Sequence, residues 1–397
     1  MIRTWRPWAA LGVSALLAAA AVTLVSGGSA GADGAARQAR PQGVPAPTAR
    51  PTAIPQNAVL AIIVNWAAGG STPANPADSV TRTLLNSRVA GASVAFQRYS
   101  YSQYGGWPSE AIGPVTIQTP TLDGGTTCGN SFVAAVRSAA FQAARNTGVE
   151  PYNFDRVLIY FPAFSTCPWK YAPTPFWDGA NHVQNLEFLL NGISGQELIT
   201  KVLGITQGID VARTLVCVDG AGKPIPRSSS CSTPDSDPYS VMGAGGTMDL
   251  TTIAKRQRHW LTAAEQPSVF VQQQTTTVTI APAEAAFPLP AGGKRGVIVA
   301  GPLDNTYYLE YRQPIGVDAG TQAATDGVLI YIFDETAFPS DRHAQSFLLD
   351  MTPSVGGGSF KDAVLRAGLS WTDPTTNIKF TVNGTNASGA TVTFGPA

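Results

Sequence analysis

The stretch Asn191-Gly-Ile-Ser-Gly-Gln-Glu-Leu-Ile-Thr-Lys-Val-Leu-Gly-Ile-Thr-Gln-Gly-Ile-Asp-Val211 decides the interpretation of the sequence. Its apolar residues recur at helical spacing, and glycine commonly ends helices, so the pattern predicts a helix from about Gly195 to Gln207 that ends at Gly208. A second motif follows further along, Asp237-Pro-Tyr-Ser-Val-Met-Gly243, and then Lys255-Arg-Gln-Arg-His-Trp-Leu261.

The residues before this stretch alternate between strand and helix patterns, which predicts a mixed α/β domain. The continuous apolar run from Ala58 to Trp66 is typical of a buried strand. The further predicted elements are a short helix at Ser79–Leu85, strands at Val89–Tyr101 and Gly113–Gln118, a helix at Asn130–Asn146, and a strand at Phe154–Phe161.

The character of the sequence changes near residue 266. Pro267–Ala281 alternates as a half-exposed strand does, and five more short strand patterns follow, separated by turn residues. We therefore expect an α/β domain at residues 57–265 and a small all-β, sandwich-like module at residues 266–397. The expected later strands are Tyr307–Tyr311, Val328–Ile332, Ser346–Asp350, Ile378–Val382 and Ala390–Phe394.

The first residues have the pattern of an export signal. Arg3 and Arg6 precede the apolar run Ala9–Val25, and small residues at Ala30 and Ala32 match a cleavage site, which predicts a signal peptide at residues 1–32. Residues 33–56, rich in Pro and Ala, are predicted to be a linker. The expected location of the protein is extracellular. The alternative is that the signal segment is not cleaved and anchors the protein in a membrane, and we predict no other contact with a membrane.

Export predicts that the four cysteines form disulfides, because secreted proteins mature in an oxidising compartment. Four cysteines allow three pairings. We favour Cys217–Cys231, which closes a short polar loop, and then Cys128–Cys167 by elimination. The alternative, a zinc site made of all four thiolates, lacks any Cys-x-x-Cys spacing.

The composition excludes several classes of function. The 397 residues hold 26 basic and 26 acidic residues, so there is no basic excess for binding nucleic acid. Only three histidines occur in the chain: His182, His259 and His343.

The two motifs together resemble those of the bacterial gametolysin-like zinc metallopeptidases, a branch of the metzincins. In that family Asn-Gly precedes a helix with the sequence His-Glu-x-x-His-x-x-Gly-x-x-His, and a later Asp-Pro-x-x-Val-Met-Gly segment forms the Met-turn beneath the zinc. Here Asn191, Gly208, Met242 and the segment ending in Trp260-Leu261 fit that pattern. The resemblance implies a metzincin-like fold from about Ala58, followed by the β module.

The resemblance does not extend to the zinc ligands or to the catalytic glutamate. With Gly208 as the family's glycine, the three zinc-ligand positions hold Lys201, Ile205 and Val211, and the catalytic glutamate position holds Val202. A catalytic zinc site uses three protein ligands and a base that takes a proton from bound water, and none of the four residues fits. We therefore expect no catalytic residue and no metal or other cofactor. We also expect Ile205 and Val211 to pack on Met242 in place of the metal.

The predicted function is a secreted pseudopeptidase that binds a protein, peptide or cell-surface ligand without cleaving it. Three alternatives stay open at this point: an active secreted zinc metalloendopeptidase or other hydrolase with unconventional ligands; an adhesion protein whose working part is the β module; and a core helix with no relation to metallopeptidases. The aromatic residues at Trp169–Trp177 suggest a second candidate contact surface, against the simpler interpretation of core packing.

Overall fold

The computed structural model describes residues 57–67, 82–173, 187–192, 195–234, 236–271, 274–302, 305–320, 323, 325–334, 346–353 and 360–397. The predicted signal peptide and linker lie outside these residues, as do His182 and His343. Within the described ranges, no helix is long and apolar enough to cross a bilayer.

The first part of the chain builds a five-stranded sheet in the order β2-β1-β3-β5-β4. Four strands run parallel, and β4 pairs antiparallel with β5 at one edge. The strands are β1 (Val59–Trp66), β2 (Ser109–Ile117), β3 (Arg156–Phe161, preceded by the short helix η1, Pro151–Asn153), β4 (Tyr171–Pro173) and β5 (Glu187–Asn191).

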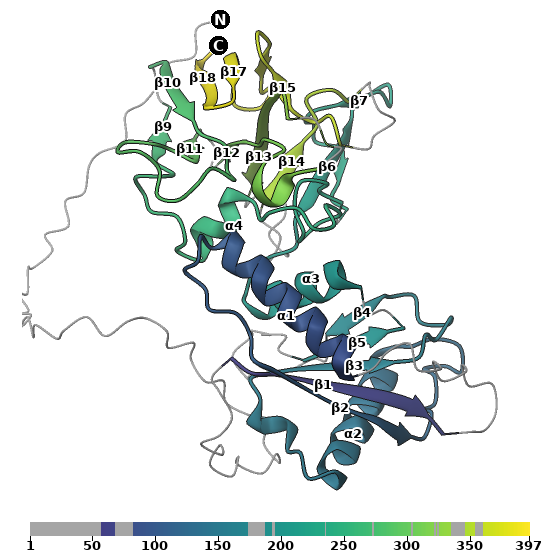
Figure 1. Ribbon diagram of the computed structural model, residues 1–397. Helices are drawn as coiled ribbons and strands as arrows, with labels where there is room; N and C mark the ends of the chain where they lie inside the picture. The colour runs from purple at the N-terminus through teal and green to yellow at the C-terminus, as the bar shows by residue number, and fades with distance from the viewer. Residues whose placement is uncertain are drawn as a thin grey trace, which may run out of the picture. The chain divides into compact units, whose positions relative to one another are not determined.

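Helices cover both faces of this sheet (Figure 1). Helices α1 (Arg82–Tyr99) and α3 (Gln196–Thr206) lie on one face, and α2 (Asn130–Asn146) lies on the other. Neighbouring residues of β1 therefore enter different cores: Ile63 packs with α1 and α3, and Ile62 packs with α2. Burial on both faces explains the continuous apolar run in β1.

Helix α1 corrects two sequence predictions. Residues 79–81 of the short helix predicted at Ser79–Leu85 lie outside the described residues, and the rest of it is helical. It continues through most of the strand predicted at Val89–Tyr101 as one helix, Arg82–Tyr99. Its buried residues are three and four positions apart, which is the helical period and not the strand period of two. They are Leu85, Val89, Ala92, Phe96 and Tyr99. The β-branched and aromatic residues in this segment suggested a strand, but the packing of one helical face prevails.

The later part of the chain is predominantly β, so the whole is a mixed α/β fold with more strand than helix. One sheet follows the path β7-β6-β14-β13-β12-β11-β9, with β8 beside β6 and β15 beside β13, and a second sheet is ordered β10-β18-β17-β16. Side chains of both sheets share one core, which is compatible with a sandwich. The remaining elements are β6 (Arg213–Val218), β7 (Pro224–Ile225), β8 (Cys231–Ser232), α4 (Thr252–Gln257), β9 (Ser268–Phe270), β10 (Thr276–Ile280), β11 (Gly296–Ala300), β12 (Asn305–Tyr311), η2 (Gly316–Asp318), β13 (Gly327–Asp334), β14 (Ser346–Leu349), β15 (Leu365–Arg366), β16 (Ser370–Thr372), β17 (Ile378–Asn386) and β18 (Gly389–Pro396).

Strand β6 connects the two parts of the sequence. It follows α3 directly, yet it pairs in parallel with β14, in the register Phe347 to Arg213. A further core joins Tyr239 and Met248 to Tyr331 of β13. Residues on both sides of the predicted boundary at 265/266 thus share a sheet and a core, and the boundary itself stays a prediction.

Candidate functional site

Helix α3 forms where the sequence predicts it. It runs from Gln196 to Thr206, and Gly208 follows with φ of +73°, a conformation that glycine adopts without steric cost. The N–H of Ile209 donates to the carbonyl of Gly204 and closes the helix end. This end fixes the register of the four positions that the resemblance assigns to zinc chemistry.

The structure places those four side chains in different surroundings. Val202 is completely buried in the core between the sheet and α3, and Ile205 is half-buried against the same core, which also holds Met242. Val211, itself described and half-buried, is not part of that core. Lys201 is half-buried, and its Nζ donates to the carbonyl of Gly243 at 3.1 Å.

The segment Asp237–Gly243 is a compact buried turn. The carboxylate of Asp237 accepts hydrogen bonds from the backbone N–H of Tyr239 at 2.8 Å and from the hydroxyl of Tyr331 at 3.2 Å. Burial is the main influence on this group, and it raises the pKa of Asp237 to about 7. Ser240 Oγ accepts from the N–H of Met242, whose side chain is only 1% exposed.

Helix α3 and this turn are in direct contact. Met242 lies directly against Gly204. A Cβ added to Gly204 would be only 2.6 Å from Met242 Sδ. The N–H of Ala212 donates to the carbonyl of Met242 at 3.1 Å, beside the bond from Lys201 to Gly243. Lys201, which the resemblance aligns with the first zinc ligand, therefore bridges the helix to the turn.

The residues present do not fit a zinc ion. Lysine is protonated near neutral pH, and the side chains of isoleucine and valine have no lone pair. Within the described ranges, no group of three His, Cys, Asp or Glu residues is placed to hold a metal ion. His259, the one histidine that the structure describes, is exposed just after α4.

The cysteines and aromatic residues support the scaffold. Disulfides join Cys128 to Cys167 and Cys217 to Cys231, the pairs favoured from the sequence, and they fit an oxidising compartment. Trp169 packs against the core beneath α2, and its Nε1 donates to the carbonyl of Cys128 at 2.9 Å. Tyr171 is half-buried against the core on the other side of the sheet, and Phe176 and Trp177 lie outside the described residues.

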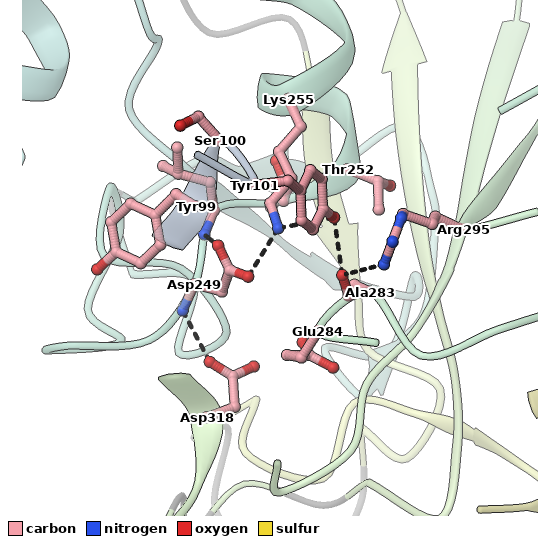
Figure 2. Close-up of polar contacts among 12 residues, drawn as sticks. Tyr99, Ser100, Tyr101, Asp249, Thr252, Lys255, Ala283, Glu284, Arg295 and Asp318 are labelled. Carbon is pink, nitrogen blue, oxygen red and sulfur yellow. Dashed lines mark hydrogen bonds and ion pairs between the residues drawn. The ribbon is translucent and has the colours of Figure 1, made fainter. Parts of the chain in front are cut away.

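A second candidate site lies where the end of α1 meets the β-rich part (Figure 2). Lys255 Nζ donates to Asp249 at 2.7 Å and to the hydroxyl of Tyr101 at 3.0 Å. The same Nζ lies 4.4 Å from the centre of the Tyr101 ring, and Arg295 lies 4.2 Å from it. Both distances are those of cation–π contacts.

The ionic network of this second site is centred on Arg312. Its guanidinium pairs with Glu310, with Asp318 at 2.6 Å and with Glu284 at 3.0 Å, and it also donates to the carbonyl of Leu250 at 3.0 Å. Arg312 and its three acidic partners are all fully buried side chains. The network joins the segment before α4 to β12 and η2.

Sequence reasoning missed this network. In the sequence, Asp249 is one of a few aspartates too loosely spaced for a calcium loop, and Lys255 belongs only to the family motif. The one local signal is Glu310 beside Arg312 at the end of an apolar strand, since charged residues are seldom buried unless they are paired. Nothing in the local sequence links that pair to Glu284 or Asp249.

Comparisons with known proteins give little guidance. No protein-family model matches the chain, and no curated protein matches it. Among solved structures, the chain is similar to catalytically inactive OgpA from Akkermansia muciniphila, crystallised in complex with an O-glycopeptide substrate. The identity is 12%, the match covers 71% of this chain and 90% of OgpA, and the TM-score is 0.25. A TM-score this low does not establish a shared fold.

Proposed function

We propose that this protein is a secreted pseudopeptidase, a gametolysin-like metallopeptidase relative that binds a protein, peptide or cell-surface ligand without cleaving it. The observation that carries the proposal is the state of the four zinc-site positions. Val202, at the position of the catalytic glutamate, is completely buried in the core, and Lys201, at the first ligand position, donates to the carbonyl of Gly243.

The physical argument concerns what these replacements do to the site. A catalytic zinc polarises water, and a neighbouring carboxylate takes the proton from it. Val202 has no group that could take a proton. The ammonium of Lys201 sits beside the Met-turn, where its positive charge opposes the entry of a divalent cation.

The binding role rests on the resemblance and on the retained scaffold. Met242 lies against Gly204 of helix α3, and the N–H of Ala212 donates to the carbonyl of Met242, so the helix and the turn pack together through protein contacts alone. A fold that keeps its packing after losing its chemistry can still present the surface of a substrate cleft. Neither a metal nor another cofactor is part of the proposal.

The test is metal analysis of the purified chain combined with a peptidase assay. We expect no stoichiometric zinc and no cleavage of casein or of O-glycosylated peptides, whether or not a chelator is present. Substitution of Lys201 by Met serves as the matched variant, because it removes the ammonium without adding a ligand, and we expect it to stay inactive. Stoichiometric zinc together with chelator-sensitive cleavage would overturn the proposal and favour an active enzyme with unconventional ligands.

A further inference from the structure

Residues 284–287, which we call the surface segment, lie at the second candidate site with one side chain turned inward. The segment belongs to the connection between β10 and β11. Ala285 is half-buried, Ala286 is exposed, and Phe287 is 48% exposed. The side chain of Glu284, in contrast, has no exposed surface. The segment can therefore leave its position by moving one buried side chain, with every strand left in place.

Glu284 enters a buried cluster that holds more acids than bases. Four carboxyl groups stand against two cations, and each of these six side chains is at most 2% exposed. Arg295 does not supply the missing charge, because it pairs with Glu265 and donates to backbone carbonyls. Since unpaired buried charges are costly, the cluster favours a proton on one of its acids. The six residues are Asp249, Glu284, Glu310, Asp318, Lys255 and Arg312.

Glu284 and Asp318 are the two acids that meet directly. Oε1 of Glu284 lies 3.0 Å from Nη1 of Arg312, and Oδ2 of Asp318 lies 2.6 Å from the same nitrogen. Figure 2 shows the two side chains next to each other. Their carboxyl groups are hydrogen-bonded to each other, and an ionised carboxylate has no proton to donate. One of the two acids is therefore protonated while they are in contact.

Glu284 is the member of the pair that holds the proton. Burial raises the pKa of Glu284 well above its usual range. Burial acts in the same direction on Asp318, but Arg312 and the hydrogen bonds to Asp318 outweigh it and lower its pKa. One of those bonds comes from the N–H of Asp249 at 2.7 Å. The charged and titratable groups around the pair are Arg98, Tyr101, Asp249, Lys255, Arg295, Glu310, Tyr311 and Arg312.

The other contacts of the surface segment are few and lie near solvent. Arg295 donates to the carbonyls of Ala285 at 2.6 Å and Ala286 at 2.9 Å. Phe287 stacks on Tyr101 at the end of α1, with ring centres 5.6 Å apart. The segment also forms one wall of a cavity of about 620 Å³, and Tyr101 lies on the wall of the same cavity. Movement of the segment would therefore widen this cavity.

We propose that the surface segment is a pH-sensitive element, which is closed over the end of α1 while Glu284 is protonated and is released when Glu284 ionises. Ionisation places a second negative charge against Asp318, and the carboxylate regains its hydration when it reaches the surface. The proposal does not depend on the pseudopeptidase proposal, because the two concern different residues.

The direction of the pH dependence follows from the raised pKa of Glu284. Closure is fully favourable at a pH below the usual pKa of glutamate, where Glu284 is protonated in both positions. As the pH rises, the released segment loses its proton first. Closure then weakens about tenfold per pH unit until the raised pKa of the closed form is passed.

The test is hydrogen exchange of the full chain between pH 5 and pH 8. The N–H of Gln313 donates to Glu284 itself, and the N–H of Ala285 donates to the carbonyl of Pro282. After correction for the intrinsic exchange rate at each pH, we expect the protection of both amides to fall about tenfold per pH unit. Strand β1 should stay better protected at every pH, because the segment opens without unfolding of the sheet.

Three variants complete the test. Glu284→Gln cannot ionise, and its amide can still donate to Asp318, so the protection of the segment should no longer depend on pH. Glu110→Gln makes the same change on the exposed surface of β2 and should behave like the wild type. Asp237→Asn removes another buried acid with a raised pKa and should keep the fall in protection.

Three results would overturn the proposal. The first is a wild-type protection that does not fall as the pH rises. The second is a fall that persists in Glu284→Gln or disappears in Asp237→Asn, because the titrating group would then not be Glu284. The third is exchange of the segment no faster than that of β1, because the segment would then open only when the whole chain unfolds.

Discussion

The contact between Gly204 and Met242 can be tested by a double-mutant cycle. A Cβ added to Gly204 would be 2.6 Å from Met242 Sδ, closer than real Cβ atoms come, and 3.1 Å from Phe96 Cζ, which is a tight contact. Overpacking of this kind lowers stability by about 1–3 kcal/mol, and the higher helix propensity of alanine offsets about 1 kcal/mol of that loss. We therefore expect Gly204→Ala to lower the free energy of unfolding by about 1 kcal/mol.

The second arm of the cycle is Met242→Ala. It empties space in the core, because Met242 is only 1% exposed, and such truncations cost about 2–5 kcal/mol. In this background the new methyl at position 204 no longer meets a sulfur atom. In the Met242→Ala background, Gly204→Ala should therefore be neutral or stabilising by up to about 1 kcal/mol. The coupling energy between the two positions is then about 1–2 kcal/mol.

The assay is urea unfolding of the wild type, the two single variants and the double variant, followed by tryptophan fluorescence. Gly91→Ala is the matched control, because its Cβ would meet the end of the Gln196 side chain instead of Met242. Its effect should be the same with and without Met242. If the effects of Gly204→Ala and Met242→Ala add within about 0.5 kcal/mol, Met242 does not pack on α3 and the Met-turn assignment is refuted.

Three further perturbations test the scaffold. Lys201→Met should lower the free energy of unfolding by about 1–3 kcal/mol in the same urea assay, because it leaves the carbonyl of Gly243 without this donor. Because burial raises the pKa of Asp237 to about 7, its contribution to stability is full below pH 4 and is lost as the pH rises toward 7. Unfolding of Asp237→Asn at several pH values should lack this part of the pH dependence; an unchanged profile would contradict the raised pKa. Replacing Cys128 and Cys167 by serine opens a link between residues 39 positions apart, with an expected loss of about 4 kcal/mol in thermal unfolding.

The sequence is informative where local patterns match the final packing. Helix α3 ends at Thr206, within one residue of the predicted end, because the glycine with positive φ at position 208 is a strong local signal. The strand prediction around Val89 is wrong, because residues that favour strands lie on a face of helix α1 that is buried by the sheet. Local propensity gives way there to tertiary packing.

The second candidate site could not be predicted, for a different reason. Asp249, Glu284 and Arg312 come from three segments that only the folded chain brings together. Each residue on its own is an ordinary charged residue in the sequence. The Met-turn motif, by contrast, is contiguous, so seven consecutive residues are enough to reveal its resemblance to a known pattern.

The pairing of β6 with β14 has a consequence for how the chain folds. Arg213 and Phe347 become neighbours only after the residues between them have been made, so this contact is highly non-local and slow to form. Until then β6 presents an unpaired edge, the kind of template on which chains aggregate. A chain that stops at residue 265 would keep that edge permanently, so the α/β part depends on the C-terminal strands to avoid aggregation.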